Sequence, residues 1–176
     1  MRAEGAKMPK GRRLNKKGRN PGMDRFTGVP HTVMKSEAYR SLSSTARSLL
    51  FELAMIENGK NNGSLYLSVR DAADRLGMSD PNSVTNAFDE LTDRGLICCT
   101  KAAHFEVKAA DHSRARCWKL TWKAANRRPP SDEWRAYCAP PDSGAAKRAR
   151  RGMAALKRYG YALSAHRLPV LETITE

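Results

Sequence analysis

The sequence predicts an α+β fold, in which three helices are followed by a small antiparallel sheet. Two observations support this class. Apolar residues recur at helical spacing between residues 36 and 94, and a strictly alternating stretch follows around Trp118. By contrast, residues 1–30 are rich in Gly, Lys and Arg and poor in large apolar residues, which is typical of a segment that stays disordered on its own.

Charge is distributed unevenly along the 176 residues, whose net charge is +14. Nine basic and two acidic residues give residues 1–30 a charge of +7, residues 31–126 carry +2, and residues 127–176 carry +5. A nearly neutral module between cationic ends is typical of a DNA-binding protein whose tails attract phosphate without reading sequence. The alternative for the amino-terminal arm is a solvated tail that aids solubility.

The composition also argues against several classes of protein. No apolar run approaches the ~20 residues of a membrane span, and the cationic start lacks the apolar core of a secretory signal. The four cysteines form no CxxC pair, so we expect reduced thiols. We also expect a cytoplasmic, nucleoid-associated protein that needs no cofactor. A zinc site is an alternative whose spacing fits no zinc finger. Its ligands would be Cys98 or Cys99 with His104, His112 and Cys117.

The first elements follow from caps and spacing. One helical turn is expected over residues 36–42, and then Ser43, Ser44 or Thr45 caps an amphipathic helix. Asn58-Gly59 should supply a left-handed stop for that helix, and residues 64–67 suit a small strand. The apolar stripe of the longer helix is Ala46, Leu49, Leu50, Leu53 and Ile56.

Two short helices joined by a tight turn are predicted next. Ser68 and Asp71 resemble a capping box at the start of the first, and Gly77 should take the left-handed turn after it. Ser79-Asp80-Pro81 begins the second helix, because a capping residue precedes a proline at the first helical position. Its inward residues are Val84, Ala87, Phe88 and Leu91, and Arg94-Gly95 closes it.

Strands are predicted over residues 96–101 and 116–122, with Trp118, Leu120 and Trp122 on one face and Cys117, Lys119 and Thr121 on the other. Residues 104–107 would extend the sheet. This order of elements is that of a winged helix-turn-helix, with three helices and a small antiparallel β-wing. It runs helix, short strand, helix, turn, helix and strand pair.

The organisation expected is a basic disordered arm (1–29), a winged helix-turn-helix domain (30–125), a Pro-containing linker with a short helical turn (126–142) and a basic carboxyl-terminal helix and tail (143–176). The short turn would pack Trp134 and Tyr137 back onto the domain. Asp142 or Ser143 would cap a last helix that reaches Tyr159, with Ala149, Met153 and Leu156 as its apolar seam.

Several stretches resemble small bacterial winged helix proteins of phages, plasmids and integrated elements. They are PHTVMKS at 30–36, AYRSLS at 38–43, NGKNNG at 58–63, SVRDAA at 68–73, DRGLI at 93–97 and WKLTW at 118–122. The resemblance covers about residues 29–122 and implies a fold rather than a biological role. One departure is that Val84 falls one residue later than in the shortest helix-turn-helix, and the basic ends lie outside the resemblance.

In such a fold the second helix of the motif, residues 81–94, would enter the major groove. Asn82 and Asn86 suit bidentate bonds to adenine, Thr85 suits a thymine methyl, and Ser83 can bond a base or a phosphate. Asp89, Glu90 and Asp93 would repel phosphate, so only the first two turns should approach DNA. The alternative is an ordinary solvated helix face.

Phosphate contacts would come from basic residues around this helix, without reading sequence. Those of the motif and wing are Arg70, Lys101, Lys108, Arg114 and Arg116, and those of the arm are Lys10, Arg12, Arg13, Lys16, Lys17 and Arg19. The cluster 147–151 is a lower-ranked candidate for the same role. Arg70 could instead pair with Asp74.

Catalysis finds little support, because the four histidines are scattered and no phosphate-cradling loop, paired-carboxylate signature or zinc-protease helix is present. Trp118 and Trp122 could form a base-stacking platform for single strands, but alternating tryptophans are more often core residues.

The sequence therefore predicts a non-enzymatic, sequence-specific binder of double-stranded DNA, a transcriptional regulator of a mobile element that acts as a homodimer on a two-part site. The alternatives are a plasmid or phage replication or maintenance protein that docks at an origin, a protein-interaction module, and an RNA-binding protein with basic tails.

Overall fold

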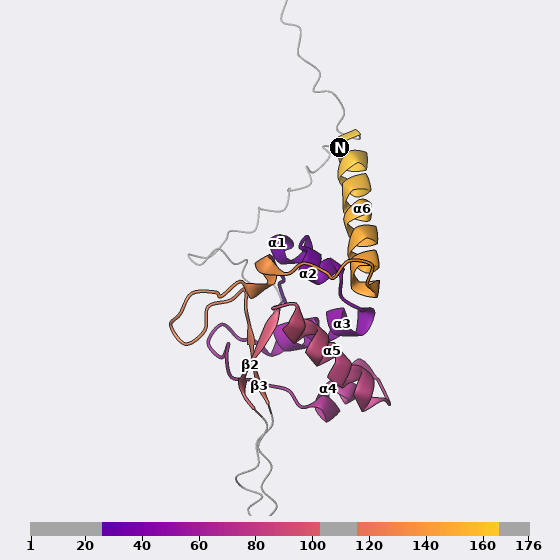
Figure 1. Cartoon of the computed structure of the whole chain (residues 1–176). Helices are drawn as coiled ribbons and strands as arrows, with labels where there is room; N and C mark the ends of the chain where they lie inside the picture. Colours follow the sequence, from indigo (N-terminus) through magenta and orange to yellow (C-terminus); the bar gives the residue numbers. More distant parts are fainter. Residues whose placement is uncertain (1–25, 103–115, 166–176) are drawn as a thin grey trace, which may run out of the picture.

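The computed structural model describes residues 26–102 and 116–165, with the backbone alone for 161–165 (Figure 1). The helices are α1 (His31–Met34), α2 (Glu37–Arg40), α3 (Ser44–Ile56), α4 (Val69–Leu76), α5 (Pro81–Asp93), the 3-10 turn η2 (Glu133–Ala136) and α6 (Gly144–Ala165). The strands are β1 (Leu65–Tyr66), β2 (Ile97–Lys101) and β3 (Cys117–Leu120). The fold is α+β with a small three-stranded antiparallel sheet, compatible with the element order that the sequence predicts.

Serine caps begin the amino-terminal helices. The Ser36 hydroxyl accepts a hydrogen bond from the Tyr39 amide (3.2 Å) at the start of α2, and the Ser43 hydroxyl accepts one from the Ala46 amide (3.2 Å) at the start of α3. The predicted turn and cap are confirmed, whereas the short helix α1, which buries Val33, was not predicted.

The end of α3 differs from the prediction. Gly59 has a left-handed φ of +91°, but α3 already ends at Ile56, and Glu57 is extended. The Asn61 side-chain amide donates to the Ile56 carbonyl (3.1 Å) and so satisfies one of the free carbonyl groups at the helix end. A side chain from the following loop replaces the predicted glycine stop.

Helices α4 and α5 match the predicted signals closely. Ser68 accepts from the Asp71 amide (3.0 Å), and Gly77 is left-handed with φ +64°, so that the Met78 amide donates to the Ala73 carbonyl (2.9 Å). Asp80 caps α5, with Pro81 at its first position. The predicted inward residues Val84, Ala87, Phe88 and Leu91 are all buried.

The sheet has the order β1-β3-β2, with Leu65 opposite Trp118 and Ile97 opposite Leu120. β3 ends at Leu120, two residues before the predicted end, and Thr121 is buried rather than outward-facing. The reason is that Thr121 turns inward and its hydroxyl donates to the Gly95 carbonyl (2.7 Å). The predicted extension at residues 104–107 lies outside the described residues.

The core lies between the helices and the sheet. α5 packs against β2, and α3 and α4 pack against α5 (Figure 1). The Phe88 ring of α5 stacks on Trp118 of β3 at 4.6 Å. Trp118 and Trp122 are only 3% and 8% exposed, and the Trp118 indole donates to the Leu67 carbonyl (3.3 Å). These burials confirm that both tryptophans are core residues, and the single-strand platform, which needs exposed rings, is wrong.

The segment after the sheet packs back onto the domain, as predicted. Trp134 of η2 is 4% exposed within the same core, and the Ser131 and Asp132 amides donate to the Thr121 carbonyl. The Ala139 amide donates to the Glu37 carboxylate (2.9 Å), which ties the same segment to α2.

The last helix is longer than the sequence suggests. Ser143 is its cap, because its hydroxyl accepts from the Ala146 amide (3.0 Å). The helix continues past the predicted end at Tyr159 to Ala165, since an interior glycine such as Gly160 costs a helix only about 1 kcal/mol. In the described parts of the chain, no helix is both long and apolar enough to cross a bilayer.

Candidate nucleic-acid interface

The first two turns of α5 present two amide side chains to solvent. Asn82 and Asn86 are both exposed, and their four-residue separation places them one above the other on one face. The opposite face carries the buried residues that pack on α3, α4 and the sheet. Within the residues that the structure describes, neither side-chain amide makes a hydrogen bond, and the core fixes the position of the helix that carries them.

The two neighbouring hydroxyls of α5 are already used within the helix. Ser83 donates to the Asp80 carboxylate (2.6 Å), and Thr85 donates to the Pro81 carbonyl (3.1 Å). Both residues are half-buried. Each hydroxyl can still accept a hydrogen bond, but neither offers a free proton, so the two asparagines are the stronger candidates for base contact.

Carboxylates lie at both ends of this face. Hydrogen bonds from the Ser83 hydroxyl and from the Asn82 and Ser83 amides hold the pKa of Asp80 below its ordinary value of 3.8, so it stays ionised at neutral pH. Asp89 and Asp93 are exposed on the same side as Asn86, one and two turns further along. This arrangement supports the expectation that phosphate is repelled beyond the second turn of α5.

Glu90 does not take part in that repulsion, contrary to expectation. Its side chain is 14% exposed and turns toward α3, where it accepts from the Ser43 amide (3.1 Å). Two guanidinium groups neutralise it, Arg94 at 2.9 Å and Arg148 of α6 at 3.0 Å. The local sequence offers only the pair with Arg94, four residues on, because Ser43 and Arg148 lie 47 and 58 residues away along the chain.

Three of the predicted phosphate contacts fall on described residues. Arg70 is exposed at the start of α4, and no ion pair joins it to Asp74 among the residues that the structure describes. Lys101 and Arg116 are exposed at the same end of the β2–β3 hairpin, where Lys101 lies opposite Cys117. Lys108, Arg114 and the arm residues Lys10, Arg12, Arg13, Lys16, Lys17 and Arg19 lie outside the described residues.

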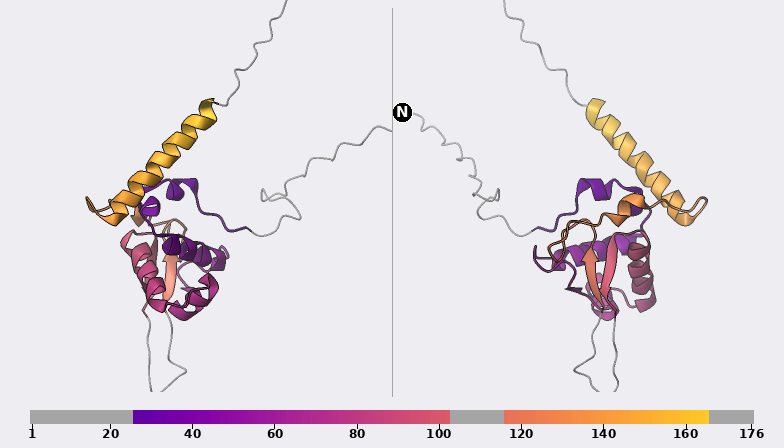
Figure 2. Two further views of the ribbon diagram at one scale, coloured as in Figure 1. Left: turned by 90° about the vertical axis from the view of Figure 1, so that its right-hand side faces the viewer. Right: turned by 60° about the vertical axis from the view of Figure 1, so that its left-hand side comes forward.

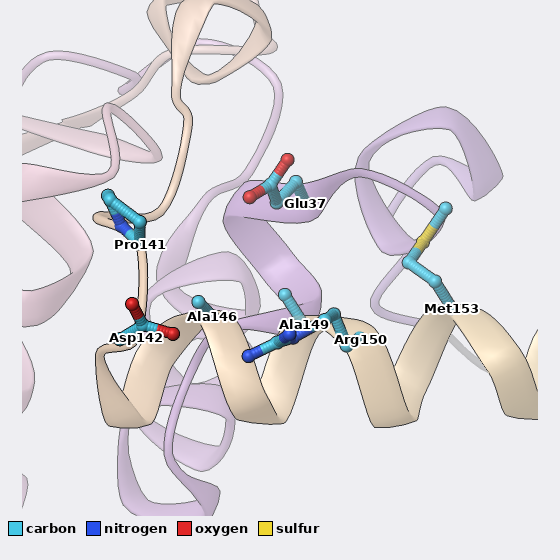
Figure 3. A pocket seen from close by; sticks show the side chains of 7 residues that line it. All are labelled: Glu37, Pro141, Asp142, Ala146, Ala149, Arg150 and Met153. Atoms are coloured by element: carbon cyan, nitrogen blue, oxygen red, sulfur yellow. The ribbon is translucent and has the colours of Figure 1, made fainter.

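A hollow of about 380 Å³ lies elsewhere, at the junction of α2 and α6 (Figure 3). Its lining combines the carboxylates Glu37 and Asp142 with the Arg150 guanidinium and apolar groups of α6. The Glu37 carboxylate already binds the Ala139 amide. The hollow is separate from the asparagine face, and its side chains include no nucleophile paired with a base.

For the metal alternative, the described residues contain no group of three or more His, Cys, Asp or Glu placed to hold an ion. Two of its candidate ligands, His104 and His112, lie outside them.

Comparison of the chain with protein-family models, with curated proteins and with solved structures finds no match in any of the three.

Proposed function

We propose that residues 30–125 form a winged helix-turn-helix that binds a specific duplex DNA sequence, as a transcriptional regulator encoded by a mobile element. α4, the Gly77 turn and α5 would be the helix-turn-helix, and the β2–β3 hairpin would be the wing. The helix order, the antiparallel β1-β3-β2 sheet and the resemblance of the sequence to winged helix proteins support this assignment.

The pair of exposed amides on α5 is the observation that carries the proposal. An asparagine amide can bond adenine at N6 and N7 together, and one good pair contributes about 1–3 kcal/mol of discrimination against a wrong base. A face that bound DNA by charge alone would carry Lys and Arg. This face carries amides followed by carboxylates, which favours base reading.

Sequence-independent affinity would come from cations placed around α5. Arg70 lies at the start of the preceding helix, and Lys101 and Arg116 lie on the hairpin. The proposal gives the same role to Lys108, Arg114 and the basic arm. Such contacts fix the register of the protein on the duplex.

Selection of bound duplexes from a random pool, with an RNA pool beside it, tests the ligand class. A sharp DNA motif supports the proposal, and enrichment of RNA alone contradicts it. Two half-sites about 10 base pairs apart would support a homodimer. The position of the site, at a promoter or at an origin, separates regulation from replication or maintenance.

Paired substitution then tests base reading. We expect Asn82→Ala with Asn86→Ala to weaken binding to the selected duplex by about 30-fold or more and to leave random duplexes nearly unchanged, because two discriminating contacts of at least ~1 kcal/mol each are lost. Asn58→Ala, which removes an exposed amide from the loop after α3, is the matched control. Equal losses on selected and random DNA would show that α5 does not read bases.

A further inference from the structure

Helix α6 is strongly cationic. Residues 144–165 contain Lys147, Arg148, Arg150, Arg151, Lys157 and Arg158 and no Asp or Glu. Within the described residues, the ion pair made by this helix joins Arg148 to Glu90. The other five cations are exposed.

The first half of α6 anchors it to the domain. Ala149 is buried, and the Arg148 guanidinium donates to the Ser41 carbonyl (2.7 Å). Gly152 packs so closely on Arg40 of α2 that an added Cβ would lie 2.9 Å from its Cδ. The carboxyl-terminal part of the helix projects away from the other elements (Figure 2).

The five exposed cations form a row on the outward side. At 100° per residue, Lys147, Arg151 and Arg158 point within about 40° of one another, and Arg150 and Lys157 follow beside them. The anchoring residues Ala149 and Gly152 lie on the opposite side. The row spans about 16 Å along the helix axis. We call it the cation row, and its members are Lys147, Arg150, Arg151, Lys157 and Arg158.

The cation row lies far from the asparagine face. Glu90, near the carboxyl end of α5, is where α6 is anchored, whereas Asn82 lies two turns earlier, at the amino end. From that anchor α6 extends away from α4 and from the hairpin end that holds Lys101 (Figures 1 and 2). A duplex bound at Asn82, Asn86 and the hairpin therefore leaves the cation row unused.

We infer that the cation row binds the phosphate backbone of a second DNA duplex, so that one protomer bridges two duplexes. The first duplex rests on the proposed function of α5. A continuous row without carboxylates matches the charge of a phosphate backbone and carries no side chain suited to reading bases in a fixed pattern. Pairing of this row with the same row of a second copy is disfavoured, because it would bring ten like charges together.

A two-duplex capture assay tests the inference with the full-length chain. The selected duplex is fixed on beads, and recruitment of a labelled duplex of unrelated sequence is measured at moderate salt. The test variant changes Lys147, Arg150, Arg151, Lys157 and Arg158 to Gln, which is nearly as good a helix former. The matched control changes five arm cations to Gln: Lys10, Arg12, Arg13, Lys16 and Lys17.

We expect the test variant to hold the fixed duplex as the wild type does but to recruit at least 10-fold less labelled duplex. The arm control should recruit clearly more than the test variant. Undiminished recruitment by the test variant, or equal loss in both variants, overturns the inference. So does a dimer in sedimentation that the test variant converts to a monomer, because bridging would then come from paired copies. Circular dichroism confirms that both variants fold.

The two proposals fail separately. If the wild type holds the selected duplex but recruits no second one, the inference about α6 fails and the proposed function stands. If the wild type prefers no sequence, base reading by α5 fails, and the same capture with random duplexes on the beads still tests the cation row.

Discussion

At the scale of single residues, a few positions with fixed backbone conformations decide where helices begin and end. Gly77 and Gly95 are both left-handed, with φ of +64° and +66°, and each follows a helix. They differ in surroundings, because an added Cβ at Gly77 meets open space, whereas at Gly95 it would lie 2.8 Å from the backbone of Glu133. The second glycine therefore serves packing as well as conformation.

This difference predicts unequal costs of substitution. Gly77→Ala should destabilise the fold by about 1–2 kcal/mol, the penalty for a left-handed non-glycine residue. Gly95→Ala should cost about 3 kcal/mol, because the methyl group also pushes η2 and the buried Trp134 outward. Urea denaturation measures the free energy of unfolding of both variants. Equal losses would show that η2 shifts to accept the methyl group at no cost in stability.

Asp80 gives a prediction about pH. Because its folded pKa is lowered by the Ser83 hydroxyl and two amides, Asp80 stabilises the fold above its ordinary pKa near 3.8. That contribution is lost as the pH falls from there through the lowered folded pKa. Asn also caps helices but does not titrate, so Asp80→Asn should lose less stability on acidification than the wild type.

Thermal or urea unfolding of the two proteins between about pH 6 and pH 2 measures the difference, and an NMR titration of the Asp80 carboxyl locates its pKa directly. Parallel pH profiles, or an unshifted carboxyl pKa, would contradict the role given to this cap.

At the scale of elements, α5 is held by more than its apolar stripe. Glu90 joins it to the start of α3 through Ser43 and to α6 through Arg148. The same carboxylate pairs with Arg94, whose side chain is 9% exposed and also donates to the Ser41 hydroxyl (2.8 Å). The helix that carries the asparagines is thus tied to the helix that carries the cation row.

Removing this carboxylate should be costly. We expect Glu90→Ala to lower the free energy of unfolding by about 2–3 kcal/mol, because two cations and a helix cap lose their acceptor in a shielded place. Glu52→Ala is the control, since its pair with the 42% exposed Arg75 should contribute less than about 1 kcal/mol. Chemical denaturation compares the two, and similar losses would show that Glu90 acts as an ordinary surface carboxylate.

At the scale of the whole molecule, the cation row and the asparagine face lie on different helices. The asparagine face lies at the amino end of α5, whereas α6, which carries the cation row, is anchored near the carboxyl end of α5 through Glu90. Residues 1–30 add a further charge of +7. The face of α5 proposed to read bases carries amides and carboxylates itself, while its nearest candidate phosphate contacts, Arg70, Lys101 and Arg116, lie on neighbouring elements. Affinity and specificity can then be altered separately by mutation.

Deleting residues 1–25 tests that separation. The deletion removes Lys10, Arg12, Arg13, Lys16, Lys17 and Arg19 together with other cations. If those six contact phosphate, the slope of log affinity against log salt should fall by about 5, at roughly 0.9 per contact. Preference for the selected duplex over random DNA should persist. A fluorescence titration at several salt concentrations measures the slope, and an unchanged slope would assign the arm no phosphate contacts.

Local signals predicted α4 and α5 almost completely, because Ser68, Gly77, Asp80 and Pro81 act on backbone groups within four residues of themselves. Prediction failed where a distant segment intervened. Thr121 was assigned to the strand face opposite Trp118, but it is buried and its hydroxyl donates to the carbonyl of Gly95, 26 residues away. The candidate site shows the same division, since spacing placed the two asparagines on one face but could not show that the Ser83 and Thr85 hydroxyls are used within the helix.

From the sequence alone we could predict the helix caps, the apolar stripes and the uneven distribution of charge, because each depends on residues that are neighbours along the chain. Tertiary packing was needed to show that the Glu90 carboxylate meets Ser43 and Arg148, and that α6 extends away from α4 (Figures 1 and 2). Both features depend on contacts between segments tens of residues apart. Burial and ion pairing in the folded chain decide them, so the local sequence does not predict them.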